Sequence, residues 1–142
     1  MKTQDFKNHV RYDPLWHFIA APLALTGLVA SFVNLARCNE ANCFESVLVV
    51  LLFLLVTVAV ALVRSYGLKV QDRAIRAEEG LRYFILTGQP LDQRLRMGQI
   101  VALRFASDAE LPALARRAAE EGLTSTQIKQ AIQQWRPDLR RV

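Results

Sequence analysis

Leu15 to Ala36 read LWHFIAAPLALTGLVASFVNLA, 22 residues that include no Asp, Glu, Lys or Arg. At about 1.5 Å per residue, such a helix is about 33 Å long, enough to cross a hydrocarbon core of about 30 Å. A second apolar run, from Phe44 to Val63, reads FESVLVVLLFLLVTVAVALV and carries one charged residue, Glu45, at its edge. Because a buried helix of a soluble protein is usually shorter and has a polar face, the two runs predict two transmembrane helices.

The positions of lysine and arginine predict which side of the membrane each end occupies. The connection between the runs holds one such residue, Arg37, and is short enough that the two helices must be antiparallel neighbours. Both flanks of the pair are basic, through Lys2, Lys7, Arg11, Arg64, Lys69, Arg73 and Arg76. We therefore expect both termini in the cytoplasm.

The predicted fold class is all-α, a two-helix transmembrane hairpin with a C-terminal cytoplasmic helical domain. The predicted segments are a cytoplasmic N-terminal segment (1–13), transmembrane helix 1 (14–36), an outward loop (37–43), transmembrane helix 2 (44–64) and the cytoplasmic helical domain (65–142). Of the 18 Lys and Arg residues, 14 follow Val63, and the net charge is +5. This basic balance suits membrane lipids with anionic headgroups and, less specifically, nucleic acid.

Small and polar residues recur along one face of the first run at steps of four and three. They are Ala20, Ala24, Gly27, Ser31 and Asn34. Small side chains let another helix approach closely, which matters in lipid because packing drives helix association there. The stripe therefore predicts a helix-packing face. Its partner is the second run, through Ser46, Phe53, Thr57 and Ala61, or another chain.

The start of the first run carries the signals of a membrane interface. Asp13-Pro14 is typical of an N-cap followed by proline at the first helical position. Trp16 and His17 fall in the first turn, at headgroup depth, where amphipathic rings are favoured. Pro22 removes one backbone hydrogen bond and should kink the helix near Phe18.

The two histidines, His9 and His17, fall with Asp13 at steps of four, the spacing of metal ligands on one helix. Pro14 argues against such a helix, because proline disfavours helical geometry in the preceding residue. Two copies of His17 in a symmetric dimer could bind haem, but we favour interfacial anchoring. The sequence therefore predicts no metal site, no cofactor and no small-molecule substrate.

Cys38 and Cys43 lie in the predicted outward loop, separated by four residues. In an oxidising compartment they can form a disulfide that closes the loop. A redox-active pair is the less favoured alternative, because the spacing is not that of thioredoxin-like motifs.

The helical pattern continues beyond Arg64 toward Thr87, where Gly88 and Pro90 end it. An apolar stripe at alternating steps of four and three runs along this helix: Val70, Ala74, Ala77, Leu81 and Phe84. Ion pairs at i,i+4 are expected between Asp72 and Arg76 and between Glu78 and Arg82.

Three further helices are predicted after Pro90. The first covers Asp92 to Ala106, and the others open at capping boxes, Ser107-x-x-Glu110 and Thr124-x-x-Gln127. The last is expected to run to Trp135. The final two resemble a helix-turn-helix loosely, but the second carries one basic residue, Lys129, so a structural hairpin is favoured over a DNA reader.

Three stretches resemble an uncharacterised family of small bacterial membrane proteins. The most specific is the opening Asn8-His9-x-Arg11-Tyr12-x-Pro14-x-Trp16-His17-Phe18. The others are Gln71–Glu79 with Arg82-Tyr83, and a tail that includes Ser107–Pro112, Ile128-Lys129 and Trp135–Asp138. The resemblance implies a two-span, multi-pass protein of the bacterial inner (plasma) membrane and brings no known activity. We expect Asn8, His9 and Arg11 to contact Asp72 and Arg73 at the cytoplasmic edge of the membrane.

The sequence favours a protein that acts by assembly or interaction, as a homo-oligomer or as an accessory subunit of a larger membrane complex. An oligomeric channel or transporter is the first alternative, although the spans hold no charge near the midplane, where ion pathways place them. A membrane-tethered DNA-binding regulator is the second. No nucleophile–base pair, carboxylate cluster or phosphate-binding loop is present, so we do not expect an enzyme and predict no catalytic residue.

Overall fold

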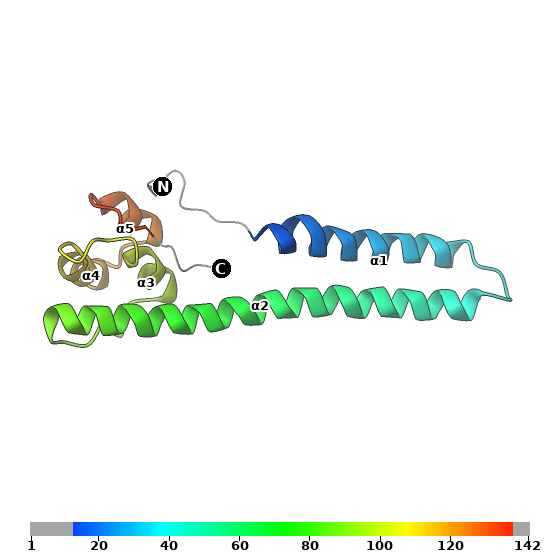
Figure 1. The fold of residues 1–142 in the computed structure, drawn as a ribbon, viewed down its shortest axis with the longest axis horizontal. Helices are drawn as coiled ribbons and strands as arrows, with labels where there is room; N and C mark the ends of the chain where they lie inside the picture. The colour runs from blue at the N-terminus through cyan, green and yellow to red at the C-terminus, as the bar shows by residue number, and fades with distance from the viewer. Residues whose placement is uncertain (1–12, 138–142) are drawn as a thin grey trace. The chain divides into compact units, whose positions relative to one another are not determined.

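The computed structural model describes residues 13–137, and every element within that range is helical (Figure 1). The all-α prediction is therefore confirmed. The elements are a π-helical turn η1 (Trp16–Ala20) and the helices α1 (Ala21–Ala36), α2 (Cys43–Thr87), α3 (Met97–Leu103), α4 (Leu111–Glu120) and α5 (Ser125–Ala131). Contacts divide the described chain into an N-terminal unit up to Leu68 and a C-terminal unit from Lys69 onward.

The first helix begins as predicted at Asp13. Its Oδ1 accepts hydrogen bonds from the backbone N–H groups of Leu15 (3.1 Å) and Trp16 (3.3 Å), so Asp13 is the N-cap. The irregularity caused by Pro22 lies where it was expected, around Phe18, and takes the form of η1. The N–H of Ala21 bonds to the carbonyl of Trp16, five residues earlier, just before the position where proline has no N–H to donate.

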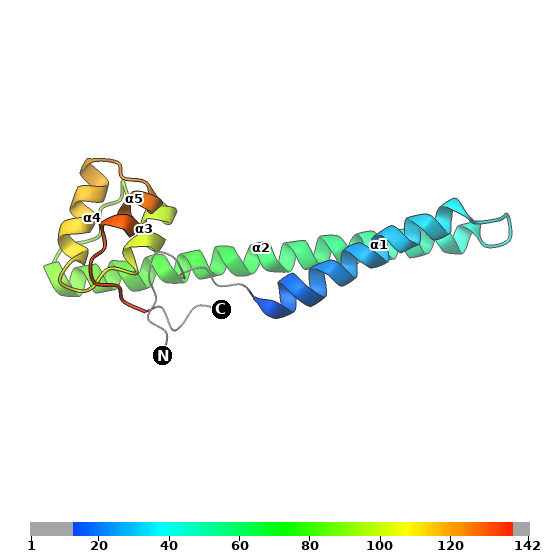
Figure 2. The ribbon, with the colours of Figure 1, turned by 90° about the horizontal axis from the view of Figure 1, so that it is seen from above.

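In the N-terminal unit, α1 lies beside the first part of α2, as both views of the ribbon show (Figures 1 and 2). Contacts pair Asn34 with Ser46 near the loop and Trp16 with Val60 at the far end, so the two helices are antiparallel. No break occurs in α2, which continues to Thr87 as predicted.

The C-terminal unit has the hydrophobic core of a small helical domain. Ile75 and Tyr83 on α2 belong to one cluster of buried side chains with residues of α3, α4 and α5, and this cluster includes Phe105, Ile100 and Ile128. These three side chains are at most 2% exposed. The short helices lie together against one side of the last part of α2 (Figure 2).

Local signals set several helix ends of the C-terminal unit. Gly88 and Gly122 adopt φ values of 70° and 64°, the left-handed conformation that favours glycine after a helix. At the start of α5, Thr124 and Gln127 form the predicted capping box, in which the Thr124 hydroxyl accepts from the N–H of Gln127 at 3.3 Å.

The prediction of a helix from Asp92 to Ala106 is wrong at both ends, because α3 covers Met97–Leu103. The Asp92 carboxylate accepts hydrogen bonds from the N–H (2.9 Å) and the guanidinium of Arg94, which stabilise a turn instead of a helix. The side-chain bond from Arg94, reinforced by the backbone bond, lowers the pKa of Asp92 below its usual value.

The Ser107–Glu110 capping box is also wrong. Helix α4 begins at Leu111, where Pro112 suits the first turn, and residues 108–110 form a turn in which the carbonyl of Ser107 accepts from Leu111 at 2.9 Å. The Glu110 carboxylate accepts instead from the N–H groups of Gln133 and Gln134, beyond the end of α5.

Helix α5 ends at Ala131 and not at Trp135. Ile132 is extended, residues 133–134 form a bend, and Trp135 forms an isolated antiparallel bridge with Ala106. The carbonyl of Phe105 accepts from the N–H of Arg136 at 2.8 Å, and the Phe105 and Trp135 rings lie 5.3 Å apart. The packing of Trp135 on Phe105 therefore stabilises this segment more than continuation of helix α5 would.

Candidate functional site

The predicted helix-packing stripe of α1 lies against α2. Ala24 and Ser31 are buried, and Gly27 lies directly against the ring of Phe53. Asn34 donates a hydrogen bond to the hydroxyl of Ser46 at 3.0 Å. Two partners were considered for the stripe, the second helix of the same chain and another chain. In the structure the second helix of the same chain packs on it, so this face of α1 is covered within the monomer.

Hydroxyl groups along this interface are bonded within their own helices. Ser31 donates to the carbonyl of Leu28 (2.7 Å) and Thr57 to that of Phe53 (2.7 Å). Ser46 donates to the carbonyl of Asn42 while it accepts from Asn34. Such bonds remove the cost of placing hydroxyls in an apolar environment, so these polar residues serve packing.

A polar cluster closes the other end of the interface. The indole N–H of Trp16 donates to the carbonyl of Val60 (3.4 Å), and the Arg64 guanidinium lies 5.6 Å from the centre of the Trp16 ring. Arg64 also lies 3.9 Å from the carboxylate of Asp13. His17 contacts Trp16 edge-on, and its Nδ1 lies 2.9 Å from the carbonyl of Asp13.

Of the other predicted interfacial residues, Asp72 and Arg73 lie within the described part of the chain. Asp72 and Arg73 are exposed on α2, while Asn8, His9 and Arg11 lie outside the described residues. Their contact with one another stays a prediction. Within residues 13–137, no group of three or more His, Cys, Asp or Glu side chains lies close enough together to hold a metal ion.

The loop between α1 and α2 joins Cys38 to Cys43. Their Cα atoms lie 5.0 Å apart, within the range that a disulfide spans, and the structure links their sulfur atoms. Asn42 supports the turn, because its side chain accepts a hydrogen bond from the N–H of Asn39 at 2.9 Å.

We expect protein from native membranes to contain no free thiol before reduction and two after it, because the loop geometry already holds the two sulfur atoms together. Thiol titration under denaturing conditions, with and without reductant, measures this. A Cys43→Ser variant, with one thiol in both states, is the control. Two free thiols in the non-reduced protein would exclude the disulfide.

Replacing Gly27 by leucine should weaken the packing of α1 on α2. A Cβ atom at Gly27 would overlap the ring of Phe53, whereas Gly67 has open space around it. Overpacking of this kind costs about 1–3 kcal/mol. Thermal denaturation in detergent, followed by Trp16 fluorescence in a Trp135→Phe background, reports the change.

Two matched variants test whether the loss caused by Gly27→Leu comes from contact with the Phe53 ring. Phe53→Ala, combined with Gly27→Leu, should recover part of the loss, because it removes the ring that the leucine meets. Gly67→Leu should cause no loss. If Gly27→Leu and Gly67→Leu behave alike, the close approach of α1 and α2 is not present in solution.

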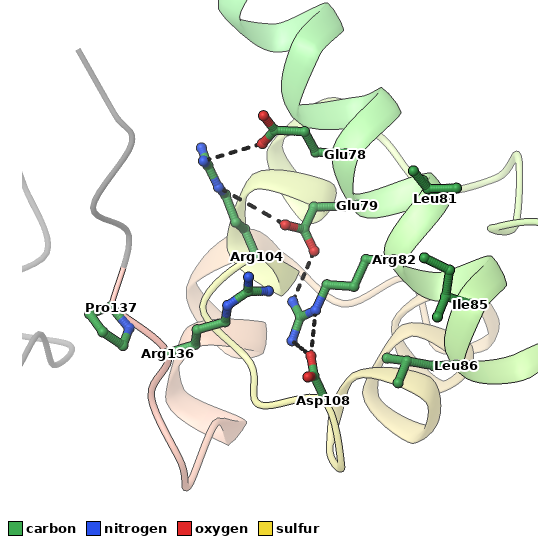
Figure 3. Close-up of a pocket in the computed structure, with 10 residues that line it drawn as sticks. All are labelled: Glu78, Glu79, Leu81, Arg82, Ile85, Leu86, Arg104, Asp108, Arg136 and Pro137. Carbon is green, nitrogen blue, oxygen red and sulfur yellow. Dashed lines mark hydrogen bonds and ion pairs between the residues drawn. The ribbon is translucent and has the colours of Figure 1, made fainter.

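In the C-terminal unit, a buried ion-pair cluster joins α2 to the turn after α3 (Figure 3). Arg82 donates to Glu79 (2.9 Å), to Asp108 (2.7 Å) and to the carbonyl of Ala106 (2.7 Å). The side chains of Glu79 and Arg82 are 7% and 12% exposed. Arg104 lies 4.0 Å from Glu79 and 3.4 Å from Glu78.

The predicted ion pair between Glu78 and Arg82 is wrong. Arg82 pairs with Glu79 at i,i+3 and not with Glu78 at i,i+4, because Glu79 faces the domain and Glu78 is half exposed. Asp72–Arg76 does not occur among the ion pairs of the described residues. Tertiary contacts with Arg104 and Asp108, which the sequence does not signal, decide which carboxylate Arg82 binds.

A cleft of about 720 Å³ lies beside the cluster. Its polar side comprises three arginines and three acidic residues, which balance in charge: Arg82, Arg104, Arg136, Glu78, Glu79 and Asp108. Its apolar side comes from α2, through Leu81, Ile85 and Leu86 (Figure 3). A charge-balanced wall gives no net attraction for an ionic ligand, so we assign the cluster a role in fixing the domain to α2.

The candidate DNA-reading helix is short and partly committed to the core. In α5, Ile128 is fully buried and the Lys129 ammonium lies 5.9 Å from the centre of the Phe105 ring. The one basic side chain of that helix therefore lies over an aromatic core residue, and the preference for a structural hairpin over a DNA reader stays a prediction.

The apolar stripe predicted on α2 does not face the domain. The domain packs on Ile75, Glu79 and Tyr83, which lie on the opposite side of the helix. The five stripe residues are exposed, and we call them the outer stripe: Val70, Ala74, Ala77, Leu81 and Phe84. The last part of α2 thus has two apolar faces, of which the domain covers one.

These features define an all-helical protein with two helices, Trp16–Ala36 and Cys43–Thr87, that are long and apolar enough to cross a membrane. The chain matches, over residues 1–142, the model of a family of unknown function (DUF6526), and it belongs to that family. Comparison with curated proteins and with solved structures gives no match. The family therefore assigns no activity to the chain.

Proposed function

We propose that this chain is a small integral membrane protein that acts by assembly, as a homo-oligomer or as an accessory subunit of a larger membrane complex. One observation carries the proposal. In the most apolar window of each long helix, 11% of the residues are buried inside the protein. Side chains such as Phe18, Leu55 and Val63 are therefore exposed, and water is a poor solvent for so much contiguous apolar surface.

The proposed orientation of the chain in the membrane rests on the distribution of Lys and Arg residues around the two spans. In this proposal α1 and the first part of α2 cross the bacterial inner membrane, and both termini are cytoplasmic, because the connecting loop holds one basic residue and both flanks hold several. The Asp13, Trp16 and Arg64 cluster then lies at the cytoplasmic interface. Indole and guanidinium groups are favoured at that depth.

Reporter fusions after Asn39 and after Val142 test this arrangement. A reporter that is active only in the cytoplasm should be active after Val142 and inactive after Asn39. A reporter that is active only outside should give the reverse. The same result at both sites would contradict a two-span arrangement.

Native mass spectrometry of protein extracted gently from its own membranes tests assembly. A defined homo-oligomer supports the first form of the proposal, and a stoichiometric complex with one other protein supports the second. A monomer with lipid alone, found also after cross-linking in intact membranes, would overturn both.

A further inference from the structure

The outer stripe follows the spacing of a coiled-coil seam. Its residues are four, three, four and three positions apart, which is the alternation of the a and d positions of a heptad repeat. Val70, Leu81 and Phe84 are 66%, 61% and 52% exposed. An amphipathic helix normally turns such a stripe toward its own domain, but here the domain uses the other face.

Small residues occupy the middle of the stripe and large ones its end. Ala74 and Ala77 let a second helix come close, and Leu81 and Phe84 offer large apolar side chains one turn further on. Ile85, which is 73% exposed, lies beside Leu81 and widens the apolar surface. Burial of these groups against a matching helix is favourable in water.

The charges beside the stripe select the partner and its direction. With Val70, Ala77 and Phe84 at d positions, Arg73 is at g and Glu78 at e. In a parallel pair of helices a g residue meets the e residue five positions later in the other chain, so Arg73 meets Glu78 of a second copy, twice by symmetry. An antiparallel pair instead places g beside g and e beside e, which brings like charges together.

We infer that the outer stripe is the contact between two copies of this chain, packed as parallel, in-register α2 helices. This inference rests on the proposed function, because two copies with the same membrane orientation already have parallel α2 helices. Confinement to one membrane also raises their effective concentration, so a seam of about two heptads suffices. Glu78, which is half exposed and 3.4 Å from Arg104, keeps carboxylate oxygen surface available to a second copy.

Cysteine cross-linking in native membranes tests the seam on the full chain. In a Cys38→Ser, Cys43→Ser background, Ala77→Cys should form a disulfide dimer under mild oxidation, because d positions face one another across a parallel seam. The matched control Arg76→Cys lies at a neighbouring exposed position of α2 but off the seam, and it should form about tenfold less dimer.

Charge reversal tests the direction of the seam. Arg73→Glu and Glu78→Arg should each lower the Ala77→Cys dimer yield, and the double reversal should restore it, because the pair is then exchanged between the copies. Equal dimer yields at positions 76 and 77, or no recovery in the double reversal, would overturn the inference.

A further comparison separates this inference from the proposed function. If native mass spectrometry finds a homo-oligomer while Ala77→Cys gives no dimer, the seam is wrong and assembly stands. If Ala77→Cys instead cross-links to a different protein in stoichiometric amount, the outer stripe has another occupant and the second-copy inference fails. If no partner appears by either method, both fail.

Discussion

Replacing Arg82 by leucine should lower the free energy of unfolding of the C-terminal unit by about 3–5 kcal/mol. The change removes the guanidinium that bonds Glu79, Asp108 and the carbonyl of Ala106, and it leaves the Glu79 carboxylate buried with Arg104 at 4.0 Å. Urea denaturation of the full chain in detergent measures the loss through the fluorescence of Trp135, in a Trp16→Phe background.

Arg94→Leu is the matched control for Arg82→Leu. Arg94 forms an ion pair with Asp92 at 2.7 Å, but its side chain is 66% exposed. Solvent screens exposed ion pairs, which contribute little to stability, so this variant should remain close to the parent protein. Similar losses for the two substitutions would show that burial of the Arg82 cluster is not what stabilises the domain.

Ile128→Ala should destabilise the same unit by about 2–5 kcal/mol. Ile128 is fully buried at the centre of α5, where α3 and α4 also pack, and truncation leaves a cavity that these short helices cannot easily close. The same urea titration measures the effect. The expected signature is a lower midpoint with little change in slope, because the surface exposed on unfolding is nearly unchanged.

Thr126→Ala controls for helix propensity in the Ile128 experiment. Thr126 lies in the same helix and is exposed, so its truncation should change the free energy of unfolding by no more than about 0.5 kcal/mol. If Ile128→Ala falls within the same range, the packing of α5 on the core is looser than the structure shows.

The sequence predicts those parts of the fold that depend on neighbouring residues. The two apolar runs, the N-cap at Asp13, the glycine at position 88 and the Thr124–Gln127 box are local signals, and the structure has each of them. The π-helical turn also lies where Pro22 places the disturbance. Each of these is decided within about one helical turn of the residue that signals it.

The sequence does not predict choices that depend on contacts between distant residues. Ser107 and Glu110 have the spacing of a capping box, but Glu110 bonds to Gln133 and Gln134 instead. The outer stripe has a clear helical period, yet the period alone does not say which of two apolar faces the domain covers. The buried pair Glu79–Arg82 depends on Arg104 and Asp108, more than 20 residues away.

The π-helical turn η1 has a consequence for how length changes in this region are tolerated. A π turn accommodates one more residue than an α-helical turn, so it is geometrically equivalent to one extra residue in an otherwise regular helix. Loss of one residue between Trp16 and Ala20 can therefore be absorbed by conversion of the turn to α-helix, with Asn34 and Gly27 kept in register against α2. Deletion of one residue between Ala24 and Ser31 cannot be absorbed in this way, because that part of the helix has no π turn. Every small residue after the deletion would rotate by about 100° about the helix axis, away from its partner on α2. Among related sequences, insertions and deletions in the first span should accordingly occur mainly on the N-terminal side of Pro22.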